Sequence, residues 1–134
     1  MTIFLYLKKI LKTPDEYSHA VRVWSIVHNI DSQLATVALL HDVVEDGYAT
    51  IEELREMWGL SGRQCDALES ITRRDDEKYF DYINRVKQNT DATIIKLADL
   101  QHNIERCSFS IDDRWSLLRK YAKAYGILKG EWKR

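Results

Sequence analysis

Residues 39–46, Leu-Leu-His-Asp-Val-Val-Glu-Asp, place four titratable side chains directly after an apolar stretch. On a helix, His41 and Glu45 lie four residues apart and share one face. Asp42 and Asp46 share a neighbouring face, rotated by roughly 100°. One metal ion can therefore bind His41 and Asp42, with Glu45 and Asp46 one turn further on beside a bound water. The alternative is a helix end whose charges are simply solvated.

Two more polar residues lie in apolar surroundings elsewhere in the chain. His19 is on a predicted helix whose other face is apolar, and Asp99 lies within the segment Lys-Leu-Ala-Asp-Leu at 96–100. Together with His41 and Asp42 they supply two imidazoles and two carboxylates from three separate helices. Such a mixed nitrogen and oxygen shell suits a divalent ion such as manganese (Mn2+) or iron (Fe2+), and zinc (Zn2+) is possible.

His19, then His41-Asp42, then Asp99 resembles the H…HD…D signature of the HD-domain metal-dependent phosphohydrolases. A longer match is more specific. Residues 39–46, then Glu-Glu-Leu-Arg-Glu-Met-Trp-Gly at 52–59 and Lys-Leu-Ala-Asp-Leu-Gln-His-Asn at 96–103, are similar to the hydrolase domain of RelA/SpoT homologues and of small stand-alone alarmone hydrolases. The similarity extends over residues 12–106.

The resemblance implies a role for each matching residue. In that family the first histidine, the HD pair and the later aspartate hold a manganese ion, which assigns as metal ligands His19, His41, Asp42 and Asp99. The E-D pair, here Glu45 and Asp46, positions and activates the attacking water and moves protons. The family asparagine close to the nucleotide corresponds to Asn103. The reaction implied is removal of the 3′-pyrophosphate from guanosine tetra- or pentaphosphate.

The segment before the first metal-binding helix departs from the family pattern. The family reads R-K-x-G-x-P-Y-I-x-H-P, whereas residues 11–20 read Leu-Lys-Thr-Pro-Asp-Glu-Tyr-Ser-His-Ala. Lys12 matches the lysine that reaches substrate phosphate, but the neighbouring arginine has no counterpart. Arg73 or Arg74, at a charged break between helices, is predicted to replace this phosphate contact, and Arg106 is a further candidate. The departure leaves open an HD nucleotidase that acts on a different nucleotide.

Other polar and aromatic side chains are predicted to lie outside the metal cluster. His28 falls at a helix end, and His102 adjoins Asp99 without facing the same way. Tyr17 and Tyr82 are candidates for stacking on a base. The tryptophans recur at helical spacing with aliphatic residues, which predicts core positions for Trp24, Trp58, Trp115 and Trp132.

The elements that must position these residues are helices. Five glycines and one proline interrupt the chain, and the apolar residues between them recur at three- and four-residue spacing, which predicts an all-α fold. Residues 13–16, Thr-Pro-Asp-Glu, have the sequence of a helix start and predict a helix to about His28. Asp31 is predicted to cap a second helix that continues to about Asp46 before Gly47 stops it.

Five further helices follow from similar signals. Capping patterns open the first two, and a charged break at 73–77 precedes the third. The last is predicted to be capped by Asp112 or Asp113. The predicted ranges are 51–58, 61–72, 79–90, 92–107 and 114–125.

Composition limits the classes of function. A chain of 134 residues with 45% apolar and 31% charged residues is predicted to form one HD domain over 1–134, without a synthetase domain. Twenty basic and 21 acidic residues give a net charge of −1, which argues against a nucleic-acid partner. The absence of a long apolar run argues against a membrane partner and, with residues 1–10 unlike a secretion signal, predicts a cytoplasmic protein. Cys65 and Cys107 match no metal or disulfide spacing and are predicted to be reduced thiols.

The sequence therefore predicts an all-α HD-domain bundle around one metal ion that hydrolyses a phosphate ester or anhydride of a small-molecule nucleotide. Two alternatives stay open: action on a nucleotide other than an alarmone, and a non-catalytic nucleotide-sensing module. Retention of both Glu45 and Asp46 favours an enzyme, because a binding module has no need of the pair.

Overall fold

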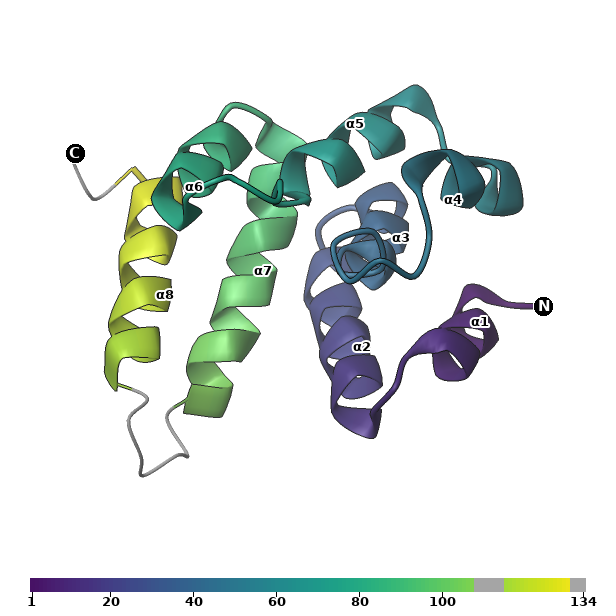
Figure 1. The fold of residues 1–134 in the computed structure, drawn as a ribbon, viewed down its shortest axis with the longest axis horizontal. Helices are drawn as coiled ribbons and strands as arrows, with labels where there is room; N and C mark the ends of the chain where they lie inside the picture. Colours follow the sequence, from purple (N-terminus) through teal and green to yellow (C-terminus); the bar gives the residue numbers. More distant parts are fainter. Residues whose placement is uncertain (108–114, 131–134) are drawn as a thin grey trace.

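The computed structural model describes residues 1–107 and 115–130, and over these residues the chain forms eight helices and no strand (Figure 1). The predicted all-α fold is confirmed. In chain order the helices are α1 (Ile3–Ile10), α2 (Pro14–His28), α3 (Ser32–Leu40), α4 (Ile51–Trp58), α5 (Gly62–Ile71), α6 (Tyr79–Lys87), α7 (Thr90–Cys107) and α8 (Trp115–Leu128).

Helix starts follow the predicted capping signals. The side-chain oxygens of four residues accept hydrogen bonds from backbone N–H groups of the first turn: Thr13, Asp31, Thr50 and Ser61. Gly59 ends α4 in the left-handed conformation, with φ 63°. Each of these helix ends is stabilised by one local side chain or one glycine. Such an end can therefore be predicted from the amino-acid sequence alone.

Several helix boundaries differ from the prediction, and one helix was not predicted. α1 was not predicted, although Thr2 caps it and Tyr6 and Leu7 bury its inner face. α6 ends at Lys87, earlier than predicted, and α7 begins already at Thr90. α8 continues to Leu128, and its predicted caps, Asp112 and Asp113, lie outside the described residues.

The prediction that the second long helix continues to Asp46 is wrong, because α3 ends at Leu40. The His41 ring approaches the carbonyl oxygen of Ala38 at 2.6 Å through Nδ1. After Leu40 the chain continues in turns, with Val43 N–H donating to the Leu40 carbonyl. Gly47 ends these turns with φ 79°. The tight turns, and not a regular helix, set the directions of His41 and Asp42.

Three helices enclose the site. α3 packs on α2, α2 lies beside α7, and α8 runs back antiparallel to α7 with α6 packed across both (Figure 1). Fully buried aliphatic side chains join these helices, among them Val23, Leu34, Leu40, Ile95 and Leu100. This packing brings the middle of α2, the end of α3 and the middle of α7 to one place. None of the described helices is both long enough and apolar enough to span a membrane.

The aromatic predictions are confirmed in part. Trp24 and Trp58 pack against the core, but Trp115 is 72% exposed, so its predicted core position is wrong. Trp132 lies outside the described residues. Tyr82 is 2% exposed, and its hydroxyl donates to the carbonyl of Ile71, so that little of its ring is accessible. Its role in stacking on a base stays a prediction.

Candidate metal centre

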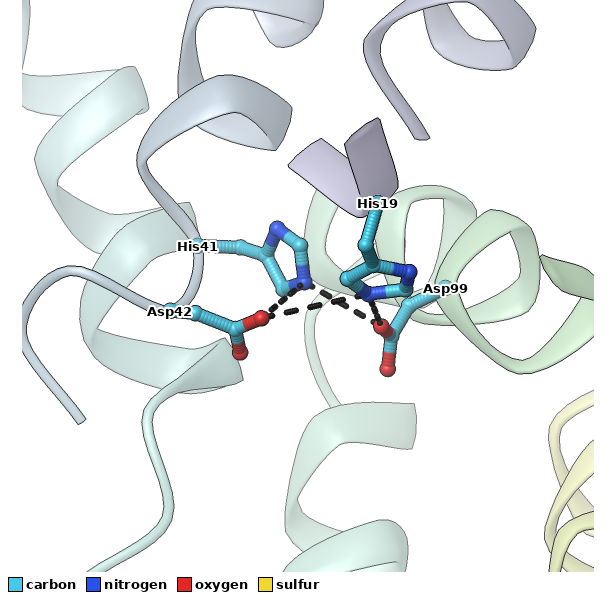
Figure 2. A group of neighbouring side chains, drawn as sticks. All are labelled: His19, His41, Asp42 and Asp99. Carbon is cyan, nitrogen blue, oxygen red and sulfur yellow. Dashed lines mark hydrogen bonds and ion pairs between the residues drawn. The ribbon is translucent and has the colours of Figure 1, made fainter. Parts of the chain in front are cut away.

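Three elements bring two histidines and two aspartates together (Figure 2). α2 supplies His19, α7 supplies Asp99, and the turn after α3 supplies His41 and Asp42. Each residue offers one ligand atom, and these atoms all lie within 4.8 Å of one another. Asp42 has a half-exposed side chain, and the other three residues are buried. The four residues predicted as metal ligands therefore form one cluster.

The distances show that the same four atoms face a common point. Asp99 Oδ1 lies 2.6 Å from His19 Nε2 and 3.1 Å from His41 Nε2. Asp42 Oδ2 lies 3.1 Å from His41 Nε2 and 3.8 Å from His19 Nε2. Two imidazole nitrogens and two carboxylate oxygens in this arrangement are a donor set for a divalent metal ion.

The second ring nitrogen of each histidine has a partner outside the cluster. His41 Nδ1 lies 2.6 Å from the Ala38 carbonyl oxygen, to which it donates. His19 Nδ1 lies 2.7 Å from Nδ1 of His102. Such outer contacts fix the ring orientation of metal-binding histidines and leave the other nitrogen facing the ion. His102 lies outside the four-residue cluster, as predicted, but the prediction that it does not face the same way as Asp99 is wrong, since both contact His19. Its position three residues after Asp99 on α7 is the signal that indicates a shared face.

Electrostatics at the cluster favour a bound cation. Burial by itself lowers the pKa of His41, but the carboxylates of Asp42 and Asp99 outweigh it and raise that pKa well above 6.5. Burial opposes ionisation of Asp99, yet Lys96 and the two histidines hold its pKa well below 3.8. Lys96 Nζ lies 2.8 Å from Asp99 Oδ2. Oδ1, the oxygen that faces the histidines, is thus ionised and held in place, which fits a metal ligand.

A pocket of about 330 Å³ opens beside the cluster. Four of the residues predicted to act on substrate line it: Glu45, Arg73, Asn103 and Arg106. The lining of this pocket does not include Asp46, Lys12 or Arg74. Lys12 lines a separate pocket in front of α2 together with Tyr17. The structure thus brings four predicted residues to the pocket beside the metal cluster and leaves three outside it.

Glu45 is exposed at the mouth of the pocket. Its Oε1 accepts a hydrogen bond of 3.0 Å from the backbone N–H of Arg73. Partial desolvation, together with the charge of Asp42, raises the pKa of Glu45 above its ordinary value although Lys96 opposes the shift. Desolvation also raises the pKa of Asp46, and the charges of Asp42 and Glu16 add to this. Both carboxyls are therefore better proton acceptors than ordinary surface acids.

The loop at 72–78, which carries Arg73, is held by an ion pair. Glu77 accepts two hydrogen bonds of 2.8 Å from Arg85 on α6. Arg85 also donates to the carbonyls of Ser70 and Thr72, and Arg73 Nε donates to the carbonyl of Glu77. These bonds fix the loop whose backbone contacts Glu45.

The Glu77–Arg85 pair is expected to make part of the stability dependent on pH. Bonding to Arg85 lowers the pKa of Glu77 from 4.5 to about 2. Because the depressed pKa belongs to the folded state, this stabilisation is fully present above pH 4.5 and is lost as the pH falls towards 2. Urea unfolding of wild type and Glu77→Gln should therefore show a difference in free energy that narrows below pH 4.5. A difference that is the same at pH 6 and pH 3 would contradict this assignment.

Comparison with known proteins finds curated relatives of this chain. No protein-family model matches it. It is 34% identical to the guanosine-3′,5′-bis(diphosphate) 3′-pyrophosphohydrolase of Haemophilus influenzae, over 65% of this chain and 14% of that protein. It is 29% identical to the bifunctional (p)ppGpp synthase/hydrolase SpoT of Escherichia coli, over 83% of this chain and 18% of that protein.

The chain spans less than a fifth of the length of the curated relatives it matches. The match nonetheless covers most of the chain itself, including the greater part of the segment on which the sequence resemblance rests. The predicted resemblance is confirmed: the chain is homologous to a segment of the (p)ppGpp 3′-pyrophosphohydrolases of the SpoT kind.

Proposed function

We propose that this protein is a metal-dependent phosphohydrolase that removes the 3′-pyrophosphate from a guanosine tetra- or pentaphosphate. The observation that carries the proposal is the convergence of His19, His41, Asp42 and Asp99 beside a pocket lined by Glu45. The relatives support the substrate class, since their names specify this reaction. The substrate would be a small-molecule nucleotide and not a nucleic acid. The net charge of −1 gives the protein no general electrostatic attraction to a nucleic-acid backbone.

The four clustered residues would hold the ion, and manganese is the ion we propose, with iron or zinc as alternatives. When bound, the ion would supply Lewis-acid stabilisation of phosphoryl charge and would acidify water. Two free cysteines, one of them buried, fit a protein of the reducing cytoplasm.

The chain's own residues would position the reactants and move the proton. Glu45 accepts a proton from the attacking water as the water oxygen forms its bond to phosphorus. The bond between that phosphorus and the 3′-oxygen of the ribose breaks, and the leaving 3′-oxygen takes up a proton from protonated Glu45 or from solvent. One water is consumed, and the products are the nucleoside 5′-di- or triphosphate and pyrophosphate. Such a reaction needs little beyond positioning and charge stabilisation.

Assignments for the remaining substrate contacts differ in their support. Asn103 and Arg73 line the pocket, which supports contacts to the nucleotide. Lys12 lies near enough to Asp46 to lower its pKa, and we propose that both act at the outer edge of the site. A contact from Arg74 stays a prediction, since its backbone N–H donates to Glu77 and its side chain is exposed.

A substrate panel tests the proposal. Purified protein reconstituted with manganese is incubated with guanosine 3′,5′-bis(diphosphate) and with nucleoside mono-, di- and triphosphates, and the products are separated by anion exchange. We expect GDP and pyrophosphate in equal amounts from the alarmone and slow or no turnover of the others. Chelator should stop the reaction.

Two other outcomes would replace the proposal. Orthophosphate released from a nucleoside monophosphate, with the alarmone intact, would indicate a nucleotidase. The altered segment at 11–20 and the separation of Lys12 from the pocket favour this second candidate. Tight nucleotide binding with no turnover by metal-loaded protein would indicate a sensing module.

A further inference from the structure

One part of the pocket wall carries two cations on one aromatic ring. Nζ of Lys120, on α8, lies 4.0 Å from the centroid of the Tyr79 ring. Cζ of Arg73, on the loop before α6, lies 5.6 Å from the same centroid. All three side chains line the pocket that also contains His19, Asp42 and Glu45. Cation–π contacts at these distances hold both charges in place before any ligand arrives.

The charge of this pair is not neutralised within the described residues. No carboxylate forms an ion pair with Lys120 or Arg73 among residues 1–107 and 115–130. Arg73 uses its Nε for the Glu77 carbonyl, which leaves its terminal nitrogens available. The nearby Lys96 is already paired with Asp99. The wall therefore presents two positive charges that are free to meet an anion.

The neighbours of Lys120 confirm that like charges gather there. Burial lowers the pKa of Lys120, and the positive charges of Arg73 and Lys96 lower it further. Two cations that repel each other at the edge of a pocket gain most from an anion that binds between them. Lys120 supplies a compact charge and Arg73 a planar fork that can bind two oxygens at once.

We propose that Arg73 and Lys120, mounted on Tyr79, form an anion subsite for a diphosphate group of the nucleotide substrate that is not the group being hydrolysed. The proposal rests on the proposed function, because it assigns the substrate of the same site a second charged group. The subsite would also compensate for the phosphate contact that is lost because the segment at 11–20 lacks the arginine of the family pattern. Lys120 lies beyond residue 106, outside the segment on which the sequence resemblance rests.

The test uses inorganic pyrophosphate and a matched lysine. Lys123, also on α8, has its Nζ 4.4 Å from the Phe80 ring, but it is exposed and does not line the pocket. Pyrophosphate is titrated calorimetrically into metal-loaded wild type, Lys120→Gln, Lys120→Arg and Lys123→Gln. Loss of one charged hydrogen bond should weaken binding by roughly tenfold or more in Lys120→Gln. Lys120→Arg, which keeps the charge, and Lys123→Gln should stay close to wild type.

Two results would overturn the subsite. One is wild-type pyrophosphate affinity in Lys120→Gln, and the other is an equal loss in Lys123→Gln, which would indicate a general effect of surface charge. Activity separates this inference from the proposed function. If Lys120→Gln loses pyrophosphate binding but wild type hydrolyses no alarmone, the subsite stands and the function fails. If wild type hydrolyses the alarmone and Lys120→Gln keeps its KM, the function stands and the subsite fails.

Discussion

Asp42→Asn is expected to leave the protein folded but unable to retain a divalent ion. Wild type reconstituted with manganese should keep about one ion per chain through gel filtration, because the four ligand atoms share a single centre. Losing a ligand should weaken metal binding by more than the roughly 100-fold seen when an outer partner is lost. Hydrolysis should fall to the level of chelated wild type. Elemental analysis and melting curves with and without manganese measure these effects.

Asp42 is the informative ligand to replace, because its side chain is half-exposed and its two buried partners, His41 and His19, keep the carboxylate of Asp99. Asp99→Asn would instead leave the ammonium of Lys96 without its carboxylate in a largely buried position, so that loss of metal and loss of fold are confounded. Asp66→Asn, on the exposed face of α5, is the matched control and should retain the ion. Manganese should raise the melting temperature of wild type and of Asp66→Asn by mass action. Unchanged metal content in Asp42→Asn would remove the basis of the metal centre.

The sequence predicted those helix ends that depend on one side chain. Thr13, Asp31, Thr50 and Ser61 act locally, so their effect is visible without the fold. The end of α3 could not be predicted in this way. At this end, His41 Nδ1 donates a hydrogen bond to the Ala38 carbonyl. His41 Nε2 at the same time contacts the carboxylates of Asp42 and Asp99. That contact with α7 exists only in the tertiary structure.

The residues of the candidate site also fall into those that the sequence predicts and those that depend on tertiary packing. The four clustered residues could be predicted because polar side chains among apolar neighbours need partners, and the family signature gave their spacing. His102 was missed although it lies on the face of α7 that carries Asp99. Lys120 carried no signal, because its approach to Tyr79 depends on how α8 packs against α6. Packing between helices distant in sequence is not encoded in any short motif.

Glu45→Gln is expected to keep the metal ion and the fold while turnover falls by roughly 100-fold or more, the usual scale for losing a general base. Glu45 faces the pocket, and its Oε1 is held by the Arg73 N–H, which leaves Oε2 to take a proton. Asp46 does not line the pocket, so Asp46→Asn should lose less activity. Turnover at saturating substrate and manganese, with metal content measured on the same samples, compares the two variants.

The pH dependence of turnover provides a second measure of the same role. A general base works when deprotonated, and the pKa of Glu45 is raised by desolvation and by Asp42. The wild-type pH profile should therefore have an acidic limb, in which turnover falls as the pH is lowered, and this limb should lie at a higher pH than an ordinary glutamate would give. The acidic limb should be absent from Glu45→Gln. If Glu45→Gln turns over substrate at the wild-type rate, Glu45 is only a solvated side chain at the pocket mouth. If Asp46→Asn loses far more activity than Glu45→Gln, the proton acceptor is Asp46, and substrate must approach from the side of the cluster where Lys12 lies.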